Sequence, residues 1–409
     1  MIEKYKNSSL NHPNSKMIMQ LLNQDGEAAK YVGGCVRDAL LKLETLDIDI
    51  ATKHEPQEII KILSTKEIKV IAPGLKHGTI TAIIDDLTFE ITTLRRDKST
   101  DGRYAEVEYT NDWLIDAERR DFTINAIYMS QDGEIFDPFS GVEHLKKQVI
   151  NFIGDTNERI NEDHLRILRF FRFSSNYGNS ISKKTLNIVK KHKDKITTLS
   201  PERIQKEFSK ILSSNNSLKI IVEMKKIGLL DIIYSGEVVT DSLERMINID
   251  EENFFDVDTF LRFFILIPKA HNLSSNLDLF RFSNKDNKRI DTLLKNKNQV
   301  KSYLSVKEVR KFLYLFGSNN FIDLIRISWA EDKKISNSTH WRALLAMAGS
   351  WEIPTLPIKA RDVMLSGVPE GPIVGEILDE LEKWWIDSDF IDDKHSLIER
   401  MRSIVRAKI

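Results

Sequence analysis

Hydrophobic and polar residues alternate along three short segments in the first quarter of the chain, at residues 68–71, 79–84 and 87–92. A period of two is typical of strands with one buried face. Asp85 and Asp86 separate the last two segments, and a short polar connection of this kind favours a tight turn. The pattern therefore predicts a β-hairpin within an N-terminal sheet.

Beyond about residue 150 the hydrophobic positions follow a helical period, and glycines become sparse as far as Gly367. The glycines and prolines of residues 367–372 predict a helix break, and residues 375–385 predict an amphipathic helix after it. The contrast indicates an α/β N-terminal domain followed by a long all-α region. A chain of 409 residues is long enough for roughly two to four domains.

The net charge of the chain is −1, which excludes nonspecific binding of polyanions by the protein as a whole. Contacts with nucleic acid would instead depend on locally segregated charge. Two lysine-rich stretches, residues 183–195 and 285–301, provide such charge, although solvated helix faces explain them equally well.

The single cysteine, Cys35, excludes an internal disulfide and a zinc site built from several thiolates of one chain. No segment approaches the roughly 20 continuous apolar residues that a membrane-spanning helix needs. The first residues also lack the apolar stretch of a signal peptide. We therefore expect a cytoplasmic protein that does not bind a membrane.

Asp47 and Asp49 alternate with Ile48 and Ile50, which indicates a strand with two carboxylates on one face and two apolar side chains on the other. Two adjacent carboxylates repel each other, and a divalent cation relieves that repulsion. Mg²⁺ fits this site because it prefers carboxylate oxygens, water and substrate phosphates. A solvent-facing edge strand is the alternative, which so short a motif leaves open.

Upstream, Gly33 and Gly34 lie between an apolar segment and a helical start that contains Arg37. Glycines allow the backbone to approach an anion, and a helix start offers free N–H groups, so this turn predicts a phosphate site. Arg37 could add a bidentate phosphate contact. An ordinary strand–turn–helix connection is the alternative. Glu90, on the polar face of a later strand, is either a third acidic group near the metal or an exposed strand residue.

Five motifs follow one another between residues 33 and 204: GGCVRD at 33–38 with DIDI at 47–50, RRDFTINA at 119–126, DPFSG at 137–141, EDHLRILR at 162–169 and LSPERI at 199–204. In this order they resemble the motifs of class II CCA-adding enzymes and bacterial poly(A) polymerases. The resemblance implies a polymerase-β-like nucleotidyltransferase head, a mixed sheet with helices, at residues 1–150. A helical neck that recognises the base (151–212), a helical body (213–330) and a helical, tRNA-binding tail (331–409) would follow.

The resemblance also implies roles for single residues. Gly34, Arg37 and Arg120 would contact the nucleotide, and Asp121 and Asn125 would help to orient its sugar. In the fifth motif, Glu202 and Arg203 would support the base-reading helix from behind.

The fourth motif gives the sharpest expectation. On one continuous helix Asp163 and Arg166 would be neighbours, with Arg169 and Arg172 on the same stripe to hold the triphosphate or orient the pair. An Asp acceptor beside an Arg donor matches the edge of cytosine or adenine and mispairs with uracil or guanine. A surface salt bridge between Asp163 and Arg166 is the alternative.

Three details of the resemblance stand apart. Arg119, which opens the second motif, could simply pair with Asp116. His144 stands where the family has Asp, a departure that concerns motion of the head against the neck. The polar residues 95–104 resemble a loop that is linked in the family to switching from C to A addition and is shortened in enzymes that add only CC; a solvated hairpin is the alternative.

Together these expectations describe a tRNA nucleotidyltransferase that adds C, C and A from CTP and ATP without a nucleic-acid template. The tRNA 3′-hydroxyl would attack the α-phosphate, with Mg²⁺ on Asp47 and Asp49, and pyrophosphate would leave. The lysine-rich stretches would grip the tRNA backbone. A poly(A) polymerase of the same family and a catalytically silent RNA-binding protein remain alternatives, and the sequence identifies no protein partner.

Overall fold

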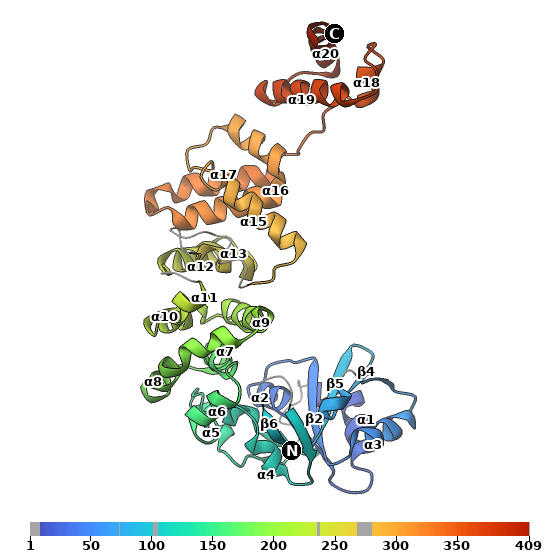
Figure 1. The fold of residues 1–409 in the computed structure, drawn as a ribbon, viewed down its shortest axis with the longest axis vertical. Coiled ribbons are helices and arrows are strands. Elements are labelled where there is room, and N and C mark those ends of the chain that lie inside the picture. The colour runs from blue at the N-terminus through green and yellow to red at the C-terminus, as the bar shows by residue number, and fades with distance from the viewer. Residues whose placement is uncertain (1–8, 73, 101–104, 235–237, 268–279, 409) are drawn as a thin grey trace. The chain divides into compact units, whose positions relative to one another are not determined.

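The computed structural model describes residues 9–72, 74–100, 105–234, 238–267 and 280–408. The chain divides into two compact units, Met1–Val238 with Pro268–Arg281, and Val239–Ile267 with Phe282–Ile409. Strands occur in the blue to cyan part of the chain, and the rest is helical (Figure 1). The predicted fold class, an α/β head followed by helices, is confirmed.

The head is built on a seven-stranded sheet with the strand order β3-β4-β5-β2-β1-β8-β9. The pair β2–β5 is parallel, whereas the other neighbouring pairs are antiparallel. A separate two-stranded ladder joins β6 to β7. The strands are β1 (Ala29–Val32), β2 (Asp47–Thr52), β3 (Lys69–Ile71), β4 (Thr79–Ile84), β5 (Leu87–Thr93), β6 (Arg95–Thr100), β7 (Ala105–Tyr109), β8 (Tyr128–Met129) and β9 (Ile135–Phe136).

The three strands that the alternating pattern predicts are all present, displaced by no more than one residue at an end. Ile84 pairs with Leu87, so that Asp85 and Asp86 form the predicted two-residue turn. Asp85 has a φ of 51°, in the left-handed region that Asp tolerates better than most residues. The hairpin between β4 and β5 is therefore confirmed.

The helices of the first unit belong either to the head, where they pack on the sheet, or to the helical segment that follows the head. α1 and α3 contribute Ile18 and Ile59 to a buried core that also contains Ile48 and Phe89 of the sheet. Full burial of such side chains stabilises the fold by about 1.5–3 kcal/mol each. The helices of the head are α1 (Pro13–Leu22), α2 (Gly34–Leu40), α3 (Pro56–Ser64), α4 (Trp113–Glu118) and α5 (Gly141–Lys146). Those that follow are α6 (Thr156–Glu162), α7 (Arg166–Tyr177), α8 (Lys183–His192), α9 (Pro201–Leu212), α10 (Ser217–Lys226) and α11 (Leu229–Ile233).

The second unit consists of helices and their connections, without a strand in its described residues. Gly317, with a φ of 76°, breaks α16 into two helices. The predicted break around Gly367 is confirmed, and the helix after it begins at Pro372, three residues earlier than expected. The helices are α12 (Asp241–Glu252), α13 (Thr259–Ile265), α15 (Asn284–Asn296), α16 (Val306–Glu331), α17 (Ser338–Ser350), α18 (Ala360–Met364), α19 (Pro372–Asp387) and α20 (Lys394–Lys408).

Residues 213–238, which the prediction assigns to the helical body, belong to the first compact unit. The division into head, neck, body and tail stays a prediction. Within the described ranges, no helix combines the length and the apolar content that crossing a bilayer requires.

Candidate active site

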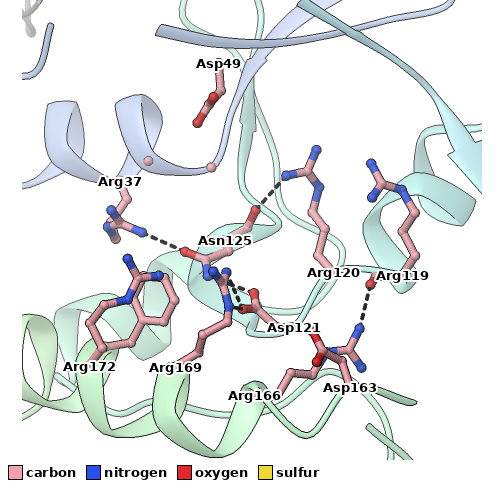
Figure 2. A pocket seen from close by; sticks show the side chains of 13 residues that line it. Arg37, Asp49, Arg119, Arg120, Asp121, Asn125, Asp163, Arg166, Arg169 and Arg172 are labelled. Atoms are coloured by element: carbon pink, nitrogen blue, oxygen red, sulfur yellow. Dashed lines mark hydrogen bonds and ion pairs between the residues drawn. The ribbon is translucent and has the colours of Figure 1, made fainter. Parts of the chain in front are cut away.

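A cavity of about 490 Å³ opens in the first unit, between the sheet of the head and helix α7 (Figure 2). Its wall is strongly polar, with one carboxylate on β2 facing a row of arginines that come from α2, the second motif and α7. The lining residues are Gly33, Gly34, Arg37, Asp49, Arg119, Arg120, Asp121, Asn125, Asp163, Arg166, Arg169, Arg172 and Phe173. Residues from three of the five motifs therefore meet in one cavity.

The acidic end of the site lies on β2. Ile48 and Ile50 are fully buried, Asp49 is partly buried and Asp47 is exposed, so both carboxylates are on one face of the strand, as the alternation predicts. Asp49 lies opposite the exposed Glu90 of the parallel strand β5. The pKa of the Asp49 carboxyl is raised to about 6, mainly by burial and also by the carboxylates of Glu90 and Asp47, against the opposing effect of Arg120 and Arg37.

The carboxylates do not form a closed protein cage for a metal. In the described part of the chain, no three His, Cys, Asp or Glu side chains are grouped closely enough to hold an ion together. Asp47 and Glu90 also lie outside the lining of the cavity. A cation on Asp49 would therefore need ligands from water or from the substrate, which is how Mg²⁺ is commonly bound.

The two glycines of the first motif lie directly beside Asp49. Gly33 caps α2 with a φ of 70°, which strains any residue with a side chain. A Cβ atom there would lie 3.7 Å from Nη1 of Arg120 and 3.8 Å from Oδ2 of Asp49. A Cβ atom on Gly34 would lie 3.6 Å from the same Asp49 oxygen. The missing side chains thus keep open the space between the carboxylate and the guanidinium groups.

Asp121 and Asn125 connect arginines from two helices. Nη1 of Arg37 on α2 donates to Oδ1 of Asn125 at 2.6 Å, and Nε of Arg169 on α7 donates to Oδ2 of Asp121 at 2.6 Å. The Asn125 amide donates to Asp121 at 2.9 Å and closes the network. Burial alone would raise the pKa of Asp121, but Arg169 and these hydrogen bonds hold it below its ordinary value.

The expectation that Asp163 and Arg166 share a helix is wrong. α6 ends at Glu162, and Asp163 has an extended backbone, with φ −149° and ψ 110°. Its carboxylate accepts the N–H of Leu165 at 3.1 Å, the local bond by which Asp side chains commonly end one helix and begin the next. Arg166 opens α7 and pairs with Glu162. Asp163 and Arg166 nevertheless both line the cavity (Figure 2).

The fifth motif contributes one residue to this arrangement. α9 begins with Ser200 as N-cap and Pro201 in the first turn, as the sequence predicts. Nη2 of Arg203 donates to Oδ2 of Asp163 at 3.0 Å, so Arg203 supports a lining residue from behind. The side chain of Glu202 is 53% exposed and pairs with Arg281 at 3.2 Å, away from the cavity.

No residue of the third motif and none of the described residues of the predicted loop is in the lining of the cavity. Nδ1 of His144 on α5 is 2.9 Å from Oγ1 of Thr123 in the second motif, so the residue that departs from the family pattern joins the two motifs. Of the predicted loop at residues 95–104, residues 95–100 form β6, which pairs antiparallel with β7, and residues 101–104 lie outside the described residues.

Sequence reasoning missed several residues that hold the arginines. Glu207 on α9 is buried and lies 2.8 Å from Nε of Arg172, whose guanidinium also lies 4.3 Å from the ring centroid of Phe173. Asp116, considered only as a simple partner of Arg119, also pairs with Arg120. The position of Glu207 four residues after Arg203 was a usable signal, because both then lie on one face of α9.

Comparison with known proteins identifies two matching family regions and a shared fold. Residues 29–151 match the family described as the poly A polymerase head domain, and residues 179–236 match a probable RNA- and SrmB-binding site of polymerase A. The structure superposes on that of the Bacillus stearothermophilus CCA-adding enzyme in complex with CTP with a TM-score of 0.74 and 24% identity, over 100% of this chain and 99% of the other. That similarity establishes a shared fold.

Similarity in sequence extends over nearly the whole chain. The human mitochondrial CCA tRNA nucleotidyltransferase 1 is 33% identical over 95% of this chain and 89% of its own length. A CCA-adding enzyme of Anoxybacillus flavithermus is 31% identical over 93% of this chain and 94% of its own. On this basis the chain belongs to the family of CCA-adding tRNA nucleotidyltransferases.

Proposed function

We propose that this protein adds C, C and A to the 3′ end of tRNA, using CTP and ATP and no nucleic-acid template. The observation that carries the proposal is that Asp49, Arg120 and Arg166 line one cavity. Template-free nucleotidyl transfer requires a carboxylate that binds the metal ion, positively charged side chains that bind the phosphates, and a donor–acceptor pair that reads the base.

We propose Mg²⁺ as the cofactor, held by Asp47 and Asp49 with Glu90 close by. The donor set fits this ion, because it consists of carboxylate oxygens on adjoining strands. Burial and the repulsion between these carboxylates raise the pKa of Asp49. When bound, the metal would lower the pKa of the attacking 3′-hydroxyl and neutralise charge on the departing pyrophosphate.

The arginines then have separate tasks. Arg37, Arg120, Arg169 and Arg172 line the cavity, where their guanidinium groups can bind the triphosphate by charge-assisted hydrogen bonds. Asp121 and Asn125 fix two of these guanidinium groups and would orient the ribose between them. No nucleophilic side chain is needed, since the attacking group belongs to the RNA.

Base selection would come from Asp163 and Arg166. The carboxylate accepts the amino group of cytosine or adenine, and the guanidinium donates to the ring nitrogen beside that group. Uracil and guanine present the opposite order and would leave buried groups unpaired, at a cost of about 1–3 kcal/mol each. This selection does not depend on a shared helix, because both side chains reach the cavity.

Contacts with the tRNA would lie in two basic regions. On α8, Lys183, Lys184, Lys190 and Lys191 are exposed. In the second unit, a cavity of about 660 Å³ has the exposed Lys285 and Lys288 of α15 in its lining. Such local charge gives a near-neutral chain the salt-dependent affinity for an RNA backbone that the reaction requires. The proposed compartment is the cytoplasm, where the one buried thiol, Cys35, would stay reduced.

One assay tests the reaction. The protein is given a tRNA that ends at the discriminator base with CTP, ATP, UTP and GTP, singly and together, and the product's 3′ end is sequenced. Two C residues with CTP alone, and CCA with CTP and ATP, are expected. Long A tails from ATP alone would identify a poly(A) polymerase. Binding of the tRNA without metal-dependent turnover would identify a catalytically silent RNA-binding protein.

A further inference from the structure

One buried acid on α4 serves two arginines of the active-site cavity. The Asp116 side chain is 1% exposed. Its Oδ1 accepts hydrogen bonds from Nε and Nη2 of Arg119 at 2.9 and 2.6 Å. Its Oδ2 accepts hydrogen bonds from Nη2 and Nε of Arg120 at 3.0 and 3.3 Å. Each carboxylate oxygen therefore holds one guanidinium group.

Tyr128 of β8 completes this cluster. Its hydroxyl donates to Oδ2 of Asp116 at 2.7 Å and accepts from Nε of Arg120 at 3.0 Å. The guanidinium of Arg120 also lies 5.2 Å from the centroid of the Tyr128 ring. Tyr128 thus contacts both partners of the ion pair, Asp116 and Arg120.

The cluster lies behind the cavity wall. Arg119 and Arg120 line the cavity, whereas Asp116 and Tyr128 do not (Figure 2). Nη1 of Arg120 remains on the cavity side, where it donates to the Asn125 carbonyl at 3.4 Å. The bonds from Asp116 therefore fix the guanidinium groups from behind.

The charges explain why a single acid lies here. Two adjacent guanidinium groups in one wall repel each other, and one buried carboxylate between them offsets that repulsion. Burial alone would raise the pKa of Asp116, but Arg120 and Arg119 hold it well below its usual range, so the acid stays charged. A buried ion pair adds little stability compared with apolar packing of the same volume. Its value here lies in the orientation that it imposes on the two arginines.

We propose that Asp116 and Tyr128 are positioning residues, which orient Arg119 and Arg120 toward the phosphates of the incoming nucleotide. The inference rests on the proposed nucleotidyl transfer and adds Arg119 to the groups that act on the triphosphate. A small displacement of an active-site group can reduce the rate about 100-fold. Loss of the contacts from Asp116 and Tyr128 should therefore lower mainly kcat.

The test compares Asp116→Asn and Tyr128→Phe with a matched control, Asp112→Asn. Asp112 is exposed and caps the same helix through the N–H of Leu114, a task that Asn performs equally well. We expect Asp116→Asn to lower kcat for C addition about 10–100-fold and to weaken CTP binding several-fold. Tyr128→Phe, which removes one hydroxyl, should lower kcat a few-fold. Asp112→Asn should match the wild type.

A double-mutant cycle between Asp116 and Arg120 distinguishes a positioning role of Asp116 from a merely structural one. In an Arg120→Ala background, Asp116→Asn should lower kcat by only a few-fold more, because the group that it orients is gone. A full second loss there, or wild-type kcat and CTP affinity in folded Asp116→Asn, would overturn the inference. If Asp116→Asn does not fold, Tyr128→Phe decides the question by the same cycle.

Binding of CTP is measured by calorimetry, which does not require turnover. If the wild-type protein binds CTP but adds no nucleotide, the proposed function fails. Weaker CTP binding by Asp116→Asn would still support the positioning of the two arginines, and unchanged binding would count against it. The two failures are therefore distinguishable.

Discussion

Asp49 on β2 lies directly opposite Glu90 on the parallel strand β5. Burial of Asp49 makes its ionised form unfavourable in the metal-free protein, and the like charge of Glu90 adds to this effect. The same repulsion is what a bound cation relieves. Stability and activity should therefore respond in opposite directions when the charge on Asp49 is removed.

We expect Asp49→Asn to lower kcat at least about 100-fold, since metal-assisted stabilisation of the transition state is worth several kcal/mol. The metal-free variant should at the same time be more stable than the wild type at pH 7. The pKa of Asp49 is raised from 3.8 to about 6, which corresponds to a gain of roughly 1–3 kcal/mol on neutralisation. Thermal melts in a chelator check this, and a lower Tm would contradict it.

Activity should fall at acid pH because the carboxylate of Asp49 takes up a proton there. An acid whose folded pKa is raised takes up a proton on folding, so metal-free stability decreases as pH rises from about 4 to about 6. Mg²⁺ needs the carboxylate, so its half-saturating concentration should rise as pH falls below about 6. Titrations of Mg²⁺ at several pH values measure this. In Glu90→Gln the acid limb should move to lower pH; an unmoved limb would argue against coupling between the two acids.

Gly33→Ala should damage the site and the fold together. A left-handed φ costs a residue with a side chain roughly 1–2 kcal/mol, and the added Cβ lies beside Asp49 and Arg120. Gly154→Ala is the matched control, since Gly154 has a φ of 76° and open space around its Cβ position. Both variants should lose similar stability in chemical denaturation, but only Gly33→Ala should lose CTP affinity. Equal affinities would show that the glycine serves the turn alone.

Arg203→Ala should relax base selection without abolishing the reaction. Arg203 holds the carboxylate of Asp163, and loss of this contact would let the acceptor move. We expect incorporation of UTP relative to CTP to rise about 10-fold, equivalent to about 1.4 kcal/mol of lost discrimination. Glu202→Ala, the adjacent residue that pairs with Arg281 outside the cavity, is the control. If both variants discriminate like the wild type, Asp163 does not need this support.

Replacing Lys285 and Lys288 together by Gln should weaken tRNA binding and leave the Km for CTP unchanged on a short RNA substrate. If each lysine contacts one phosphate, the salt dependence of log K should fall by roughly 1.5–2. Lys295 and Lys301 lie outside the lining of the second cavity and provide a control pair of equal charge. Filter binding at several salt concentrations measures the slope. An equal loss in both pairs would indicate nonspecific attraction.

Local pattern was enough to predict β3, β4 and β5 and the shared face of Asp47 and Asp49 on β2. Both depend on alternation alone, and β4 begins and ends where the pattern indicates. The change to helices beyond the head follows from periodicity in the same way. Ser200 and Pro201 mark the start of α9 because each has a physical preference for that place.

The conformation of Asp163 and the burial of Asp116 depend on tertiary contacts, which local pattern does not reveal. Asp163 is an acid within a helical pattern, and its carboxylate instead accepts a backbone N–H and is held by Arg203 from another helix. Asp116 precedes two arginines at helical spacing, which is a visible signal. Its burial, however, depends on Tyr128 from a distant strand, which spacing cannot reveal.

The six residues between α2 and β2 are exposed at Leu41, Leu43 and Leu46, by 39%, 50% and 65%. One extra residue inside β2 would exchange its two faces, sending carboxyl groups into the core and isoleucines into solvent. An insertion at residues 41–46 would leave that register unchanged. Length variation among homologues should therefore be tolerated in this connection and forbidden within the strand that follows it.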